Sequence, residues 1–160
     1  MKIEARLQEL GFVLPEPLTL PEGARLPFPW VHVRGRRVFV SGHGPQQADG
    51  SFAGPFGKVG AEVSPEQAYE SARLIALAML GSLKRELGDL DRVTAWLRVF
   101  GMVNSAPDFT RQPTVINGFS DVILAVYGEE VGAHARSAVG MAALPFGIPV
   151  EVEAEVEVDG

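Results

Sequence analysis

The feature that most constrains this chain is an unbroken alternation of small apolar residues and glutamates over residues 150–158. Alternate residues of a strand point to opposite faces, so this segment is predicted to be a β-strand with four carboxylates on one face. We expect water to surround most of these carboxylates. Glu151, which lies next to the preceding loop, is the expected exception, because a glutamate buried in a subunit contact has a raised pKa and can hold or activate water.

Two longer helices are predicted from apolar residues that recur at helical spacing. The first begins with Ser64, Pro65 and Gln67, which form a capping box with proline in the first turn, and it ends at Gly88. The second starts at about residue 108 or 114 and runs to 127. Gly118 interrupts its pattern, which indicates close packing or the approach of a ligand at that point.

The strands predicted from alternation and turn residues complete an α+β pattern. They cover residues 30–33, 37–41, 92–103, 136–144 and 150–158. Together with the helices they predict one sheet with two helices on one face. A short helix at residues 2–10, followed by five prolines between 15 and 29, predicts an N-terminal arm (residues 1–27) that precedes the domain proper (residues 28–160).

Two helices leave the second face of such a sheet apolar and uncovered, notably at Trp96 or Leu97 of the central strand. Monomeric proteins rarely expose patches of this kind. Self-association is therefore expected.

Composition excludes several classes of function. The chain has no cysteine, which removes thiolate nucleophiles and cysteine-ligated metals. Its three histidines lack metal-binding spacing, so no metal site is expected, and His43 is expected to be a loop side chain near water. The net charge is −6, which argues against nucleic-acid binding. No apolar run is long enough for a membrane span, and the first residues do not resemble a secretory signal, so we expect a cytoplasmic protein.

Arg136 opens a strand of small, apolar residues and is a candidate anion-binding group. Its guanidinium can hold a carboxylate by two parallel hydrogen bonds, although a structural salt bridge is an equal alternative. The last strand is expected to run back antiparallel after the turn, so Arg136 and Glu151 are expected at opposite ends of the sheet, about 20–25 Å apart at 3.3 Å per residue. They can then share a site only if a neighbouring subunit supplies one of them.

The C-terminal segment carries a specific family resemblance. It reads Ala135-Arg136-Ser137-Ala138-Val139-Gly140-Met141-Ala142, followed by Leu144-Pro145, Gly147 and Pro149-Val150-Glu151-Val152-Glu153-Ala154. Further matches are Val38-Phe39-Val40-Ser41-Gly42, Pro45, Gln67-Ala68, Asn104, Asp108-Phe109 and Val115-Ile116-Asn117. Over residues 28–158 the chain resembles the YjgF/RidA family, also labelled L-PSP endoribonucleases, and in particular a longer, divergent subgroup.

This resemblance implies a chorismate-mutase-like fold and a homotrimer with clefts between subunits. It also implies hydrolysis of reactive 2-imino or enamine acids, such as 2-aminoacrylate, to 2-oxo acids and ammonia, without a cofactor. By the resemblance Arg136 clamps the substrate carboxylate and Glu151 positions the attacking water. The sheet order that it implies, residues 37–41, then 150–158, 92–103 and 136–144, sets Ser41 beside Glu151 and leaves Arg136 to the neighbouring subunit.

The remaining site residues follow from the same resemblance. Ser41, Gly42 and Asn117 line the cleft. Trp30 replaces the tyrosine usual in the deaminases, and it either narrows the cleft or packs as core. Ala138 replaces a frequent cysteine. Two other functions stay open: a non-enzymatic trimer that binds a small carboxylate metabolite, and an endoribonuclease, which the net charge disfavours.

Overall fold

The computed structural model describes residues 1–160, and its main elements follow the order expected from the sequence. They are α1 (Lys2–Glu9), β1 (Val31–Arg34), β2 (Arg37–His43), α2 (Pro65–Leu87), the 3-10 turn η1 (Leu90–Arg92), β3 (Val93–Asn104), α3 (Gln112–Gly132), β4 (Ala135–Met141), the 3-10 turn η2 (Pro145–Gly147) and β5 (Val150–Val158). None of the helices has the length and apolar character needed to cross a bilayer.

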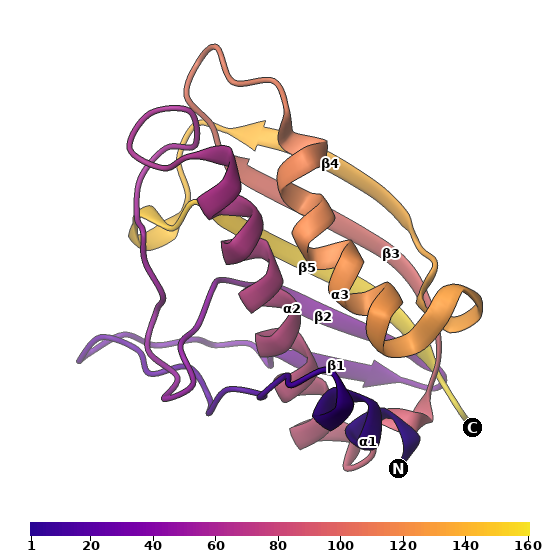
Figure 1. The fold of residues 1–160 in the computed structure, drawn as a ribbon. Coiled ribbons are helices and arrows are strands. Elements are labelled where there is room, and N and C mark those ends of the chain that lie inside the picture. Colours follow the sequence, from indigo (N-terminus) through magenta and orange to yellow (C-terminus); the bar gives the residue numbers. More distant parts are fainter.

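The five strands form one sheet in the order β1-β2-β5-β3-β4. The β1–β2, β2–β5 and β3–β5 pairs are antiparallel, whereas β3 and β4 run parallel. β5 therefore lies between β2 and β3, and β4 forms an outer edge (Figure 1). This agrees with the strand order implied by the family resemblance, with β1 added beyond β2.

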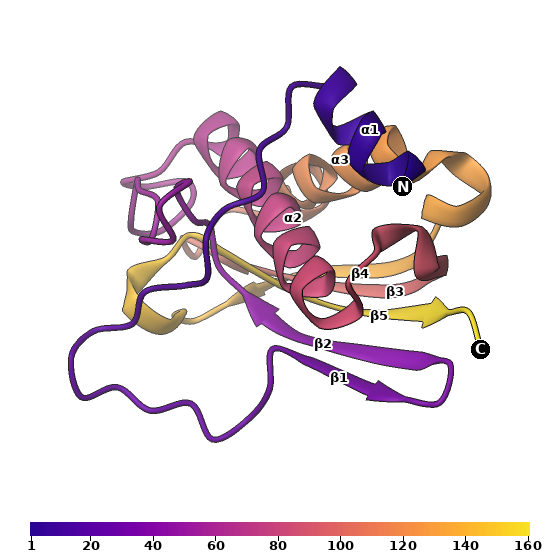
Figure 2. The ribbon, with the colours of Figure 1, turned by 90° about the horizontal axis from the view of Figure 1, so that it is seen from below.

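The two long helices lie side by side on one face of the sheet (Figures 1 and 2). α2 begins with the predicted capping box, because the Ser64 side chain accepts from the Gln67 N–H and the Gln67 side chain accepts from the Ser64 N–H. α3 packs against it at Gly118, where an added Cβ would collide with the Tyr69 carbonyl oxygen of α2. The glycine inside the predicted helix thus permits close helix packing.

A third helix, α1, joins the two helices that were expected on this face of the sheet. α1 contacts α3 and η1 on the same side of the sheet, and its Leu7 is buried (Figure 2). The Asp91 carboxylate of η1 accepts hydrogen bonds from the backbone N–H groups of Lys2 and Ile3, both at 2.8 Å. These bonds satisfy donors that a helix N-terminus leaves free, so the arm begins as a docked helix.

The two faces of the sheet differ as the alternation of β5 predicts. Its valines and Ala154 are buried beneath the helices, and its four glutamates point to the open face. On that face Arg37 pairs with Glu155 at 2.8 Å, and Arg36 lies 3.5 Å from Glu157. The open face also leaves Phe39 and Val139 exposed, each by 38%.

Trp96 is excluded as the apolar residue of the open face, for which Trp96 or Leu97 was expected. Trp96 is buried under α3, where its ring meets those of Phe119 and Tyr127 at 6.0 and 5.9 Å. The pairing of β3 with β5 shifts register on both sides of Trp96. A bulge adds a residue without reversing the faces of its neighbours, so simple alternation along residues 93–100 assigns the wrong side.

Candidate functional site

Glu151 and Gly42 are in direct contact where β2 leaves regular pairing. The register between β2 and β5 shifts between Val40 and His43, which places Ser41 and Gly42 in a bulge. A Cβ at Gly42 would collide with the Glu151 carboxylate oxygen Oε2, so only glycine leaves room for the carboxylate in this position. Burial, assisted by the nearby Glu153, raises the pKa of Glu151 above its usual range.

Glu151 faces a cavity of about 210 Å³ with predominantly apolar walls. β2, β5 and the η2 turn form one side, and the N-terminal arm forms the other. The lining residues are Leu18, Leu20, Leu26, Phe28, Trp30, Gly42, Gly44, Phe52, Pro145, Phe146, Ile148 and Glu151. Glu151 is thus the one ionisable side chain in the wall.

Trp30 forms part of this wall, held between two other aromatic rings. Its ring meets Phe28 edge-on at 5.9 Å and His43 at 5.0 Å. The Ser41 hydroxyl donates to the Pro29 carbonyl at 2.8 Å, and Ser41 is not among the residues that line this cavity. Ser41 therefore fastens the arm beside Trp30.

His43 is buried, contrary to the expectation of a loop side chain near water. It ends β2 and points under the helices, because the bulge before it restores the buried face. Its Nε2 lies 2.8 Å from Ser82 Oγ and its Nδ1 lies 2.6 Å from the Ser41 carbonyl oxygen. Burial lowers the pKa of His43 to about 4, so the ring is neutral at pH 7. This neutral ring packs against the ring of Trp30.

Arg136 and Asn117 form a second, separate cluster at the β4 edge. Arg136 Nη1 donates to Asn117 Oδ1 at 2.9 Å and to Ser120 Oγ at 3.1 Å, and Nη2 donates to the Pro113 carbonyl at 3.3 Å. Ser120 Oγ also lies 2.8 Å from Nε2 of His134. Burial lowers the pKa of Arg136, but a guanidinium stays protonated at any physiological pH.

The predicted site residues therefore fall into two groups. Trp30, Gly42 and Glu151 meet at the cavity, and Ser41 lies behind them. Arg136 and Asn117 meet at the edge of α3 and β4. Ala138, on the same strand as Arg136, packs against the core beneath the helices and reaches neither group.

The predicted separation of Arg136 and Glu151 needs correction, because β4 and β5 are not neighbours. β3 lies between them and pairs Val99 with Arg136 and Met102 with Glu151, so the two residues differ by three positions, about 10 Å along the strands. Arg136 reaches α3, whereas Glu151 is on the opposite, open face. Within one chain the two side chains cannot meet, although they are not at opposite ends of the sheet.

The sequence analysis missed the apolar wall of the cavity. Leu18, Leu20 and Leu26 come from the arm, and Phe52 and Phe146 come from two loops. The available signal was the repeated leucine between the prolines of residues 15–29, which marks an extended segment with a buried side. Phe146 has a left-handed backbone, φ 59°, which no sequence pattern announces.

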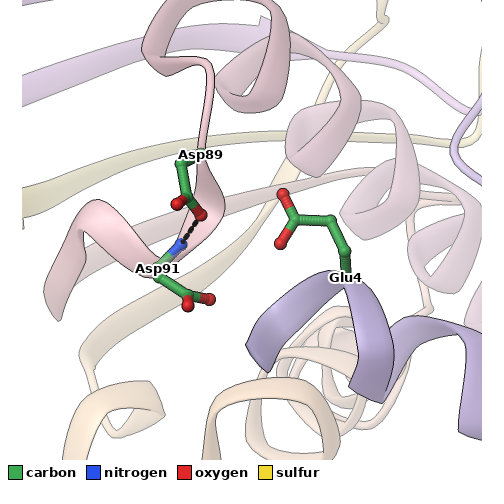
Figure 3. A group of neighbouring side chains, drawn as sticks. All are labelled: Glu4, Asp89 and Asp91. Atoms are coloured by element: carbon green, nitrogen blue, oxygen red, sulfur yellow. Dashed lines mark hydrogen bonds between the residues drawn. The ribbon is translucent and has the colours of Figure 1, made fainter. Parts of the chain in front are cut away.

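A group of three carboxylates lies away from both clusters, where α1 docks on η1 (Figure 3). Glu4 of α1 points toward Asp89 and Asp91. Each carboxylate already has partners: Asp91 binds the start of α1, Asp89 accepts from the Asp91 N–H at 2.9 Å, and Glu4 pairs with Lys84. These contacts attach α1 to η1 and leave the Glu4 oxygen Oε2 buried without a hydrogen-bond partner.

Several known proteins are similar to this chain in sequence or in structure. The chain is 41% identical over 160 residues to Protein TCP17 of Trypanosoma cruzi, covering 99% of this chain and 95% of that protein. Among solved structures, Atu1372 of Agrobacterium tumefaciens is 41% identical with a TM-score of 0.84, covering 99% of this chain and 92% of that one. A "putative endoribonuclease" of Shewanella oneidensis MR-1 is 27% identical with a TM-score of 0.86, covering 98% and 99%.

The family match extends over most of the chain. Residues 4–151 match the family described as "YjgF/chorismate mutase-like, putative endoribonuclease". This range includes most of the arm, the Gly42 bulge, both long helices and the start of β5. The chain therefore belongs to the YjgF/chorismate-mutase-like family.

Proposed function

We propose that this chain hydrolyses 2-imino acids to 2-oxo acids and ammonia. The observation that carries the proposal is the position of Glu151, a single carboxylate in an apolar cavity, fixed against Gly42 and with a raised pKa. A carboxylate in such surroundings binds a water molecule and accepts a proton more readily than one in bulk water. Imine hydrolysis needs little more than a positioned water and a nearby base.

The reaction balances without a cofactor. The water oxygen attacks the C=N carbon, while its proton moves to the Glu151 carboxylate. Glu151 gives this proton to the nitrogen, which yields a tetrahedral carbinolamine, and then takes the carbinolamine hydroxyl proton and passes it to the same nitrogen. The C–N bond breaks, ammonia leaves, and the C=O bond of the 2-oxo acid forms. The enzyme regains its starting protonation state at the end of the cycle.

Arg136 of a neighbouring subunit is the proposed partner of the substrate carboxylate. It lies on the edge strand, at the surface of the chain, and Asn117, Ser120 and a backbone carbonyl hold it. The proposed assembly is a homotrimer in which the open sheet faces, with Phe39 and Val139 exposed, pack against one another. Each cleft then combines Glu151 of one chain with Arg136 of the next.

The endoribonuclease description of the family finds no support in the charges of this chain. RNA binding relies on cations that neutralise phosphates. Here the net charge is −6, and β5 presents four glutamates on the open face. The proposed substrate is accordingly a small carboxylate.

The first test measures the decay of freshly generated 2-aminoacrylate and 2-iminobutanoate, with semicarbazide trapping of the remaining imine. Wild type is expected to accelerate release of the 2-oxo acid, and Arg136→Ala is expected to lose this acceleration. Arg34→Ala, which removes an exposed arginine of the hairpin turn, is the matched control and should retain it. No acceleration by wild type would contradict the proposal, and retained binding of the 2-oxo acids would then favour a carboxylate-binding protein.

Mixed assemblies test the shared cleft. Glu151→Gln and Arg136→Ala subunits, each inactive alone, are co-expressed in equal amounts with different tags and purified together. In a mixed trimer whose clefts each take one residue from each of two neighbouring subunits, one cleft in three carries both intact residues, so about a third of wild-type activity returns. Mixed assemblies as inactive as either parent would exclude a cleft shared in this way.

A further inference from the structure

Resting on the proposed function, we infer that the preferred imine carries a bulky apolar side chain, branched aliphatic or phenyl, next to the C=N carbon. The inference comes from the walls of the cavity that Glu151 faces. It distinguishes this substrate class from 2-aminoacrylate and other small imines.

The arm supplies the part of the wall that faces away from the sheet. Leu18, Leu20, Leu26 and Phe28 all line the cavity, and the arm crosses from the helix layer past the edge of the sheet before β1 (Figure 2). Backbone hydrogen bonds hold this segment, since Thr19 N–H donates to the Gly50 carbonyl at 3.0 Å. Leu18 and Leu20, on either side of Thr19, are therefore held in place.

The volume of the cavity suits a substrate side chain larger than a methyl group. The cavity measures about 210 Å³, and a dry apolar cavity of about 150 Å³ is enough to bind benzene. A methylene or methyl side chain would leave most of this apolar space without contacts. An isobutyl or benzyl group would occupy it and displace water from apolar walls.

The lining of the cavity disfavours substrates whose own side chain carries a charge. Apart from Glu151, no lining residue has a group that ionises, so a second carboxylate on the substrate would find no cation and would face Glu151. Burying such an unpaired charge is strongly unfavourable. Imines derived from acidic amino acids are thus expected to be poor substrates.

The rim of the cavity carries a second, independent sign of apolar recognition. Phe146 adopts φ 59° and ψ 14°, and it is the one residue other than glycine with a positive φ. Its ring meets Phe52 at 5.2 Å although its side chain is 58% exposed. Strained conformations of this kind persist where a side chain must be held in place for a ligand, and here the strain presents an aromatic ring at the opening.

The test compares 2-imino acids generated in situ by an L-amino acid oxidase from alanine, leucine, phenylalanine and glutamate. We expect kcat/KM for the leucine- and phenylalanine-derived imines to exceed that for the alanine-derived imine by at least about 10-fold, which is the discrimination that one or more methylenes provide in an apolar pocket. The glutamate-derived imine should be the slowest. In parallel, calorimetry compares binding of 4-methyl-2-oxopentanoate and pyruvate.

The outcomes separate the two proposals. Equal or faster turnover of the alanine-derived imine overturns this inference and leaves the proposed function intact. No turnover of any imine, with tighter binding of 4-methyl-2-oxopentanoate than of pyruvate, overturns the proposed function and supports the apolar cavity. No turnover and no difference in binding overturns both.

A matched pair of variants on the arm assigns the preference to the cavity wall. Leu20→Gln places a polar group in the wall, and Thr19→Gln introduces the same side chain at an exposed neighbour that does not line the cavity. Leu20→Gln should lower the ratio of kcat/KM for the leucine-derived to the alanine-derived imine by about 10-fold, and Thr19→Gln should leave this ratio unchanged. Circular dichroism confirms that both fold, and an equal ratio in both variants would overturn the assignment.

Discussion

The Glu151 cavity and the Arg136 cluster show how differently one chain can surround two charges. Glu151 has apolar neighbours and a raised pKa, and it contacts a glycine in place of a hydrogen-bonding partner. Arg136 sits among an amide, a hydroxyl and a carbonyl oxygen, each accepting one of its N–H groups. The first setting favours a change of protonation, and the second fixes a permanent charge in one orientation.

Because of this difference, neither cluster by itself can form a complete site for an anionic imine. A carboxylate in an apolar cavity has no cation for an anionic substrate, and the guanidinium at the edge has Asn117, Ser120 and His134 around it but contacts no carboxylate. The two lie on opposite sides of the sheet, so only a neighbouring chain can bring them together under the proposed function. The following predictions test each half of this contrast.

Replacing Glu151 should have the largest effect. Glu151→Gln keeps the size of the side chain but cannot accept a proton, so kcat for imine hydrolysis should fall by about 10²–10⁴. Binding of the 2-oxo acid should remain measurable by calorimetry. Because the pKa of Glu151 is raised, wild-type activity should decline with falling pH at values above the ordinary glutamate pKa. Glu157→Gln, on the same strand face, is the control, and equal loss in both variants would contradict a role specific to Glu151.

Adding one carbon at Gly42 should displace the same carboxylate. Gly42→Ala would collide with Glu151 Oε2, and a misplacement of about 1 Å can cost about 10² in rate. The activity assay should show this loss, and thermal unfolding should show a folded protein. In the Glu151→Gln background the alanine should add little, because both changes act on one group. Additive losses would mean that Gly42 matters for another reason.

Protonation of His43 should lower the stability of the folded chain at acid pH. Its pKa of about 4 lies below the ordinary value, so its contribution to stability is complete above pH 6.5 and is lost as the pH falls toward 4. Between pH 7 and pH 5 the free energy of unfolding should fall by about 2 kcal/mol, or about 30-fold in the folding equilibrium. Urea unfolding at fixed protein concentration should show a smaller decrease for His43→Gln. The exposed His32→Gln should behave as wild type, and an unchanged pH dependence in His43→Gln would contradict this account.

The smallest effect is expected on the arginine side. Asn117→Ala removes one of three acceptors that orient Arg136, so KM should rise about 10-fold while kcat changes little. Steady-state kinetics would separate the two parameters. Thr114→Ala, an exposed change on the same helix, provides the control. A fall in kcat with unchanged KM would mean that Asn117 acts on the reaction itself.

Much of the fold was predictable because each element carries its own local signal. The capping box at Ser64 and the alternation of residues 150–158 correspond to α2 and β5 as predicted. The bulges were not predictable, since inserting one residue leaves no mark in composition. They account for the wrong side assigned to Trp96 and for the buried position of His43.

The two site clusters were predictable only in part. The family motif selects Glu151, Gly42, Arg136 and Asn117, and the first pair and the second pair are each in contact. The division between the pairs depends on β3 lying between β4 and β5, a long-range arrangement that no local pattern specifies. The arm leucines were missed for the same reason, because their wall exists only once the arm crosses the sheet edge.

The left-handed backbone of Phe146 also has an evolutionary consequence. Glycine would adopt this conformation without strain, and the adjacent Gly147 already does so with φ 70°. If nothing selected for an aromatic ring at position 146, substitution by glycine or asparagine would relieve the backbone strain and stabilise the fold. Under the proposed function, the frequency with which related sequences keep phenylalanine at this position would therefore measure how strongly selection maintains the aromatic opening of the cavity.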